Sequence, residues 1–148
     1  PTSSLMYSLV MNAQNGGFYM GKPIELVAYE AQINAVREAA KNGPCVIVGR
    51  CADYILRDHP RCVNVFVSAS KEARIERLMR IHNIPSEAAE ELMEKADKKR
   101  SSYYNYYSYK TWGAAETYHL CIDSSVLGID GTVQFIKEFV KLKLGIQK

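Results

Sequence analysis

The stretch Cys45-Val46-Ile47-Val48-Gly49-Arg50-Cys51-Ala52-Asp53 carries the strongest structural signal in the chain. Gly43-Pro44 precedes it, and a run this rich in Val and Ile predicts a strand over residues 45–49 that is buried on both faces, as in parallel sheets. The polar residues then follow at the carboxyl end of that strand, where open parallel sheets bind their ligands. Arg50 and Asp53 therefore indicate either an anion or nucleotide site, or a local ion pair at a strand-to-helix turn.

Strands and helices alternate along the rest of the chain. Apolar residues recur at steps of three and four between Ile24 and Lys41, which predicts an amphipathic helix. Residues 63–67 and 118–123 predict two more strands. The alternation favours an α/β fold, a parallel sheet flanked by helices on both sides, in a single domain over residues 1–148. The other predicted helices cover residues 52–57, 70–82 with Ser70 as N-cap, 86–107 with Ser86 as N-cap, and a closing segment capped by Asp130.

The composition is that of a globular protein. Of its 148 residues, 47% are hydrophobic and 24% are charged, which excludes the compositions typical of disorder. A formal net charge of +3 is too small to indicate nucleic-acid binding, although it favours an anionic substrate. The sequence contains neither an apolar run of about 18 residues nor a signal-peptide pattern. We therefore expect a cytoplasmic protein that does not enter a membrane.

The cysteines and histidines give no sign of a metal site. The cysteines form no C-x-x-C pair, and two of them fall in predicted strands, so we expect reduced core thiols. The histidines share no ligand spacing, and we assign them no function. The residues concerned are Cys45, Cys51, Cys62 and Cys121, and His59, His82 and His119.

One short motif resembles a phosphate-binding loop. Gly16-Gly17-Phe18-Tyr19-Met20-Gly21-Lys22-Pro23 fits G-x-x-x-x-G-K, but it has proline where such a loop needs Ser or Thr for Mg²⁺. Bulky aromatic residues fill its interior. The run Leu5–Met11 upstream is not clearly a strand. These departures favour a glycine-rich surface loop.

Arginines recur on two of the predicted helices. Arg74, Arg77 and Arg80 are spaced by three, so they can either neutralise phosphates or form a solvated face with a Glu76–Arg80 ion pair. On the next helix Asp97 and Arg100 share a face with Tyr104 and Tyr107. Arginine is suited to phosphoryl groups because its guanidinium is always charged and binds in a bidentate manner.

Aromatic and basic residues alternate around the end of the second of these helices. Such a stretch can stack the bases of single-stranded nucleic acid. More often it packs against the domain body or a second subunit, which would make the protein a homodimer. We favour packing over nucleic-acid binding. The residues are Tyr103, Tyr104, Tyr106, Tyr107, Tyr109 and Trp112, with Lys98, Lys99, Arg100 and Lys110.

Taken together, three segments resemble the cytidylate kinase-like family, nucleoside monophosphate kinases of the phosphate-loop fold. They cover residues 46–53, 65–77 and 121–133, and the resemblance extends over residues 43–143. It implies a three-layer α/β sheet with a helical lid at about residues 71–112. It also implies that Arg50 holds the phosphate of the acceptor nucleotide and that Asp53 recognises its base or sugar.

The chain departs from this family at the donor site. The family carries its phosphate loop after a first strand that lies between the strands predicted here at 45–49 and 63–67, and no segment here supplies that loop convincingly. We therefore expect the amino-terminal strand and loop to be missing from this chain, which would leave it unable to hold ATP productively. Strand exchange with a partner chain, using Leu5–Met11, is the less favoured alternative.

The resemblance implies phosphoryl transfer from Mg²⁺-bound ATP to CMP or a related pyrimidine nucleotide in the intact protein. Arg74, Arg77 and Arg100 would be the catalytic lid residues, and Asp97 would join Arg50 and Asp53 in binding substrate. Two other functions stay open. One is a nucleotide-binding or regulatory module without turnover, and the less favoured one is a single-stranded nucleic-acid-binding domain.

Overall fold

The computed structural model describes residues 18–19 and 22–146. The chain divides into two compact units, Pro1–Arg57 and Asp58–Lys148, and each is described by itself. The single kinase-like domain over residues 1–148, with its lid at about 71–112, stays a prediction. The described part of the chain has no helix that is long and apolar enough to cross a membrane.

The described part of the first unit is built on one long helix. Strands β1 (Phe18–Tyr19) and β2 (Lys22–Pro23) pair antiparallel and lead into helix α2 (Ile24–Lys41), whose predicted bounds are confirmed. Helix α3 (Ala52–Ile55) is shorter than the predicted 52–57. Val36 of α2 packs with Ala52 and Ile55 in a small buried core. The strands β1 and β2 are the described part of the glycine-rich motif, and Leu5–Met11 lies outside the described residues.

The strand predicted over residues 45–49 is wrong. This segment is irregular, and Val46 and Val48 are 93% and 86% exposed, while Ile47 packs against the small core. A parallel strand is stabilised by hydrogen bonds to its neighbours, and no described residue pairs with this segment. The expectation of core thiols also fails at Cys45 and Cys121, because both side chains are exposed, whereas Cys51 is buried.

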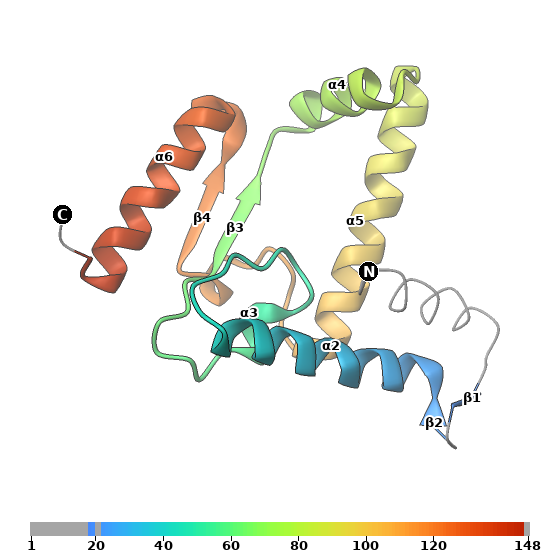
Figure 1. The fold of residues 1–148 in the computed structure, drawn as a ribbon. Helices are drawn as coiled ribbons and strands as arrows, with labels where there is room; N and C mark the ends of the chain where they lie inside the picture. The colour runs from blue at the N-terminus through green and yellow to red at the C-terminus, as the bar shows by residue number, and fades with distance from the viewer. Residues whose placement is uncertain (1–17, 20–21, 147–148) are drawn as a thin grey trace. The chain divides into compact units, whose positions relative to one another are not determined.

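The second unit combines two strands with three α-helices (Figure 1). Strands β3 (Val65–Ser68) and β4 (Leu120–Asp123) pair in parallel, from Val65 opposite Leu120 to Ser68 opposite Asp123. Helices α4 (Lys71–His82) and α5 (Ser86–Ser108) form a hairpin after β3, and the 3₁₀ helix η1 (Ala115–Thr117) precedes β4. Helix α6 (Ser124–Leu144) follows β4. The fold of the described residues is therefore mixed α/β and mostly helical, with a parallel sheet of two strands rather than the expected three.

Side-chain caps explain where two of these helices begin. Ser70 is confirmed as the N-cap of α4, because its hydroxyl accepts a hydrogen bond from the Ala73 amide at 3.2 Å. The cap predicted at Asp130 is wrong. Asp123 takes that role, accepting from the Ser125 amide at 2.8 Å, and the Ser125 hydroxyl and amide together lower the pKa of its carboxyl. The predicted boundary instead coincides with a kink at Gly128, where φ is 67°.

Helix α5 begins without a side-chain cap. Pro85 precedes its first turn and makes no capping hydrogen bond through its side chain, so Ser86 is not the cap that the sequence predicted. Proline fits this position because its fixed φ suits the start of a helix. The helix still begins at the predicted residue and ends one residue after the predicted 107, at Ser108.

Aromatic rings fill the space between β3 and the end of α5. The Phe66 ring centroid lies 5.4 Å from that of Trp112 in an edge-to-face contact and 5.0 Å from that of Tyr118. Tyr104 is buried and lies 6.3 Å from Tyr118. Part of the aromatic stretch therefore packs against its own unit. Tyr106 and Tyr109 stay exposed, at 73% and 87%.

His119 is expected to make the stability of this unit depend on pH. Its Nδ1 accepts a hydrogen bond from the Asn64 amide at 2.9 Å, and partial burial followed by the charges of Lys143 and Lys110 lowers its pKa below the ordinary 6.5. The neutral ring is therefore the folded form. Its contribution is fully present above pH 6.5 and is lost as the pH falls through the lower folded pKa. We expect urea unfolding to show a free energy of unfolding that declines below pH 6.5.

Two histidine variants test the source of that decline. His119→Gln removes the titration and should flatten the dependence between pH 7 and pH 5, whereas His82→Gln on α4, whose histidine carries no such hydrogen bond, should leave it unchanged. A decline of equal slope in His119→Gln would show that other groups cause it.

Candidate functional site

An unusual backbone turn presents Arg50. Gly49, Arg50 and Cys51 all adopt left-handed conformations, with φ of 68°, 61° and 51°. For a residue other than glycine this costs about 1–2 kcal/mol. Backbone bonds from the amides of Ala52 and Ile55 to the carbonyls of Gly49 and Cys51, at 3.2 and 2.9 Å, hold the turn in place.

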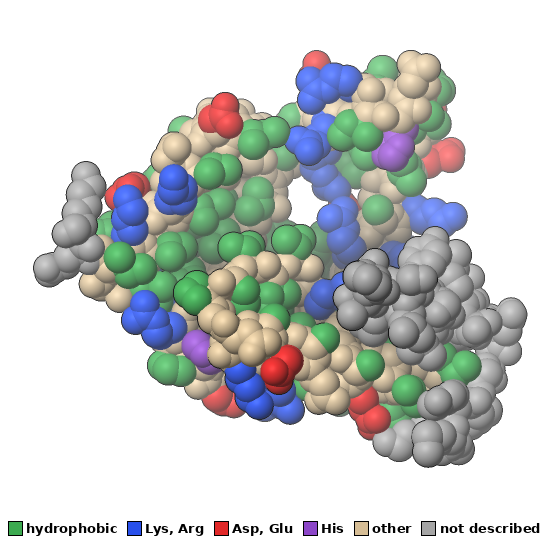
Figure 2. Space-filling model, in the orientation of Figure 1, with side chains coloured by type: hydrophobic (Ala, Val, Ile, Leu, Met, Phe, Trp, Pro, Cys, Tyr) green, Lys and Arg blue, Asp and Glu red, His purple; other side chains and the backbone are tan. Residues whose placement is uncertain are grey.

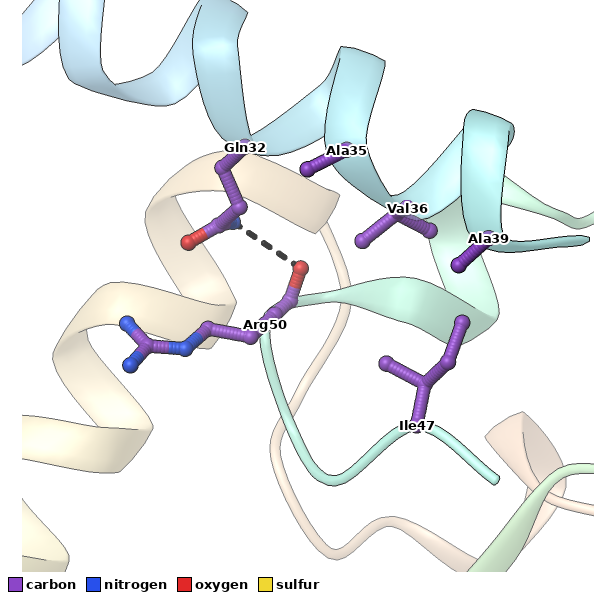
Figure 3. Close-up of a pocket in the computed structure, with 6 residues that line it drawn as sticks. All are labelled: Gln32, Ala35, Val36, Ala39, Ile47 and Arg50. Atoms are coloured by element: carbon purple, nitrogen blue, oxygen red, sulfur yellow. Dashed lines mark hydrogen bonds between the residues drawn. The ribbon is translucent and has the colours of Figure 1, made fainter. Parts of the chain in front are cut away.

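A buried glutamine adds a side-chain hydrogen bond to this turn. The side-chain Nε2 of Gln32, only 5% exposed, donates to the Arg50 carbonyl at 3.0 Å (Figure 3). Gln32 was not among the residues predicted from the sequence to form the site. A signal was present, because Gln32 falls on the apolar face of the predicted helix, three residues after Tyr29 and four before Val36. A polar residue in such a position is buried only with a partner.

The Arg50 side chain is available to a ligand. It is exposed and makes no ion pair with a described residue, so the predicted alternative of a local Arg50–Asp53 ion pair is wrong. Asp53 lies half-buried in the first turn of α3. The structure therefore presents a fixed cation to solvent from a turn whose conformation is held by several hydrogen bonds.

An open hollow of about 210 Å³ lies beside the same turn. Its walls come from α2 and from the segment before the turn, and most of them are apolar. The Arg50 guanidinium points away from the Ile47 and Ala39 side of the hollow, while the backbone carbonyl of Arg50 faces Gln32 (Figure 3). The hollow is lined by Gln32, Ala35, Val36, Ala39, Ile47 and Arg50.

In the second unit, one carboxylate joins two arginines from different helices. Asp97 of α5 accepts two hydrogen bonds from Nη2 of Arg74 on α4, at 2.8 and 2.7 Å, and one from Nη2 of Arg100, at 2.6 Å. The side chains are 31% exposed for Arg74, 27% for Asp97 and 58% for Arg100. Two positive charges thus surround one negative charge, and the cluster keeps a net positive charge that suits an anion. Lys and Arg side chains gather along α4 and α5 in Figure 2.

Trp112 completes this cluster on another side. The Arg100 guanidinium carbon lies 5.5 Å from the centroid of the indole ring, a cation–π contact. The sequence placed Trp112 only in a general aromatic stretch. Its partner could not be read from spacing, because the contact depends on how the chain turns after α5.

Arg77 and Arg80 do not join the cluster. Both are exposed, and among the described residues neither forms an ion pair, so the predicted Glu76–Arg80 pair is also absent there. The structure therefore brings Arg74, Asp97 and Arg100 together. Arg77 stays outside this cluster. The roles of Arg50, Asp53, Arg74, Arg77, Asp97 and Arg100 in binding or catalysis stay predictions.

Comparison with known proteins identifies the family. The model of the cytidylate kinase-like family matches residues 1–126. The chain belongs to the cytidylate kinase-like family. Membership suggests a nucleotide kinase-like function in general terms, and every candidate side chain of both units lies within the matched range.

A solved structure is similar in fold, and its title gives no function. It is the crystal structure of an uncharacterized protein from Eubacterium ventriosum ATCC 27560, with a TM-score of 0.76 and 30% sequence identity. The match covers 79% of this chain and 74% of the other. No curated protein matches the chain. The cytidylate kinase-like assignment therefore rests on the family match, and the substrate has to be argued from the site.

The thiol beside Arg50 should be unreactive in the folded chain. Burial, followed by the charge of Asp53, raises the pKa of Cys51 to about 11, against an ordinary value of 9.0. Its thiolate population at pH 8 is therefore about a hundred-fold smaller, and the thiolate is the reactive form. We expect iodoacetamide at pH 8 to label the exposed Cys45 and Cys121 and to spare Cys51, as measured by peptide mass spectrometry.

Unfolding supplies the control for this labelling. In urea all four thiols should react at similar rates, since their environments become alike. Labelling of Cys51 in the folded chain as fast as that of Cys45 would show that the turn opens readily, in conflict with its hydrogen bonds to Gln32 and α3.

Proposed function

We propose that the intact protein is a nucleoside monophosphate kinase that transfers the γ-phosphoryl group of ATP to CMP or a related pyrimidine nucleotide. Family membership supports the reaction class. The observation that carries the proposal is the exposed Arg50 guanidinium on a left-handed turn whose carbonyl is held by the buried Gln32. A preorganised cation of this kind suits a phosphate group, because little conformational freedom is lost when the anion binds.

In this proposal the first unit binds the acceptor. The Arg50 guanidinium donates hydrogen bonds to the phosphate of the nucleoside monophosphate, and a guanidinium can do so with two parallel N–H groups. Asp53, on the first turn of α3, accepts hydrogen bonds from the base or the sugar. Both roles come from the resemblance to the family, and both can be tested by substitution.

The arginines of the second unit act on the transferred group. An oxygen of the acceptor phosphate attacks the γ-phosphorus, the bond from that phosphorus to the β,γ-bridging oxygen breaks, and ADP leaves. The protein supplies no nucleophile. Arg74, Arg77 and Arg100 neutralise charge on the phosphates and help to exclude water, and Asp97 orients two of them.

ATP would arrive with Mg²⁺. The described residues contain no group of three or more His, Cys, Asp or Glu side chains that could hold a metal ion. Mg²⁺ enters as the ion that accompanies ATP and neutralises its phosphates. The 148 residues contain no G-x-x-x-x-G-K-[ST] motif that would hold the phosphates of the donor.

A coupled ATP turnover assay tests the proposal. It should be run with CMP, UMP, dCMP and AMP, on this chain and on a version extended at its amino terminus by any residues that its gene encodes before Pro1. We expect no turnover by this chain, and turnover of a pyrimidine nucleotide by the extended protein. The Arg50→Gln variant of the extended protein should lose most of that turnover.

The other functions predict different results. If the extended protein binds a nucleotide but turns over none of the four, the kinase proposal fails and a nucleotide-binding module is left. If instead the chain binds single-stranded oligonucleotides with steep salt dependence, the exposed Tyr106 and Tyr109 become candidates for base stacking.

A further inference from the structure

We propose that Trp112 is a positioning residue that holds the Arg100 guanidinium ready for a phosphate. This inference rests on the proposed function, since it assumes that Arg100 meets a phosphate group. It concerns a residue outside the predicted site. Trp112 is the chain's one tryptophan, and its ring centroid lies 5.5 Å from the Arg100 guanidinium carbon.

The Trp112 ring is itself held in place. Its backbone amide donates to the Asn105 side-chain oxygen at 2.8 Å, and its ring meets Phe66 of β3 edge to face, with an interplanar angle of 82°. Gly113 follows in a left-handed conformation, and Phe66 lies close enough to contact any side chain placed there. The indole is thus held against strand β3 of the second unit.

Arg100 is held from two sides and still has donors to offer. Nη2 donates to Asp97 at 2.6 Å and Nε donates to the Ala96 carbonyl at 3.4 Å, while the indole lies against the guanidinium. Among the described residues nothing accepts from Nη1. A phosphate can therefore bind along that edge of the guanidinium without displacing Asp97 or the ring.

The contrast with Arg77 shows what the two contacts add. Arg77 is exposed on α4 and makes no ion pair with a described residue. A free arginine side chain must lose rotamer freedom when it binds an anion. The Arg100 side chain is 58% exposed. Without its contacts to Asp97 and Trp112, it would lose as much rotamer freedom on binding an anion as Arg77 would. Trp112 should therefore strengthen phosphate binding through Arg100 without touching the phosphate.

A double-mutant cycle tests this coupling. Inorganic pyrophosphate serves as the probe, and its dissociation constant is measured by calorimetry for the unmodified chain, Trp112→Leu, Trp112→Phe, Arg100→Gln and the Trp112→Leu/Arg100→Gln double variant. We expect Arg100→Gln to weaken binding about ten-fold and Trp112→Leu about three-fold. Trp112→Phe, which keeps an aromatic ring against Phe66, should bind nearly as the unmodified chain does. In the Arg100→Gln background, Trp112→Leu should change nothing.

Each other outcome is decisive. If Trp112→Leu weakens binding equally in both backgrounds, or does not weaken it in the first, Trp112 does not act through Arg100 and the inference fails while the proposed function stands. If Arg100→Gln binds as tightly as the unmodified chain, or the unmodified chain does not bind pyrophosphate, the proposed role of Arg100 itself fails.

Fluorescence gives a second readout that leaves Trp112 intact. Since the chain has one tryptophan, its emission reports this ring alone. Pyrophosphate should change that emission in the unmodified chain and leave it flat in Arg100→Gln. An emission change of equal size in Arg100→Gln would overturn the inference, even if Trp112→Leu does not fold.

Discussion

Replacing Arg50 with alanine is expected to weaken the binding of CMP by about ten- to a hundred-fold. Hydrogen bonds to a charged group contribute about 1.5–3 kcal/mol, and each 1.4 kcal/mol is a factor of ten in affinity. Arg50 is exposed and has no ion-pair partner among the described residues, so its charge is available to the phosphate. Isothermal calorimetry with CMP, and with cytidine as the ligand that lacks the phosphate, measures the effect.

Two matched variants show whether the loss is specific. Arg37→Ala removes an exposed arginine of α2 in the same unit, and with it the same charge, and should leave CMP affinity unchanged. Arg50→Lys keeps the charge but not the bidentate geometry and should fall between alanine and arginine. An equal loss of CMP affinity in Arg37→Ala would show that the net charge of the protein, and not a specific contact with Arg50, determines the affinity. If Arg50→Ala weakened the binding of cytidine as much as that of CMP, Arg50 would not act through the phosphate.

A second large effect is expected at Gly113. Valine there should lower the free energy of unfolding by about 2–5 kcal/mol, because backbone strain at a φ of 78° costs about 1–2 kcal/mol and overpacking costs about 1–3 kcal/mol. A Cβ at this position would lie 3.2 Å from Cζ of Phe66, whose ring is already packed against Trp112 and Tyr118. Urea unfolding followed by circular dichroism measures the change.

Gly145 offers the matched control. It has a similar left-handed φ of 63° at the end of α6, but an added Cβ would meet no atom within 4 Å. Gly145→Val should therefore cost only the backbone term, about 1–2 kcal/mol. The difference between the two variants isolates the contact with Phe66. If both variants lost the same free energy of unfolding, the ring of Phe66 would be able to move aside without destabilising the protein.

Local patterns predicted most of the helices and two of the three strands, and failed at the third strand and at two helix caps. The bounds of α2 and the Ser70 cap of α4 follow from residues within a few positions of each other, and both were predicted correctly. The strand at 45–49 failed because its Val and Ile content specifies a strand only if another strand lies beside it. The cap at Asp130 failed because Asp123 competes with it, and its predicted boundary reflects the kink at Gly128.

The candidate site divides in the same way. Arg50 was predicted from its place after an apolar run, and Asp97 and Arg100 from their spacing on one helix face. The contact between Arg74 and Asp97 requires the hairpin of α4 and α5, which spacing along one helix cannot supply. Gln32 and Trp112 act through contacts with Arg50 and Arg100 that only the folded chain defines.

Ion pairs contribute to the contact between α4 and α5. Helix α4 contributes no fully buried side chain to it, and ion pairs from Lys71 to Glu90 and from Arg74 to Asp97 join the two helices. Exposed ion pairs weaken as salt screens them. The strength of the contact between α4 and α5 should therefore depend on the ionic strength of the medium. We expect concentrated salt to weaken the contact between the two helices and to leave the contact of Tyr104 with Tyr118, near the carboxyl end of α5, unchanged.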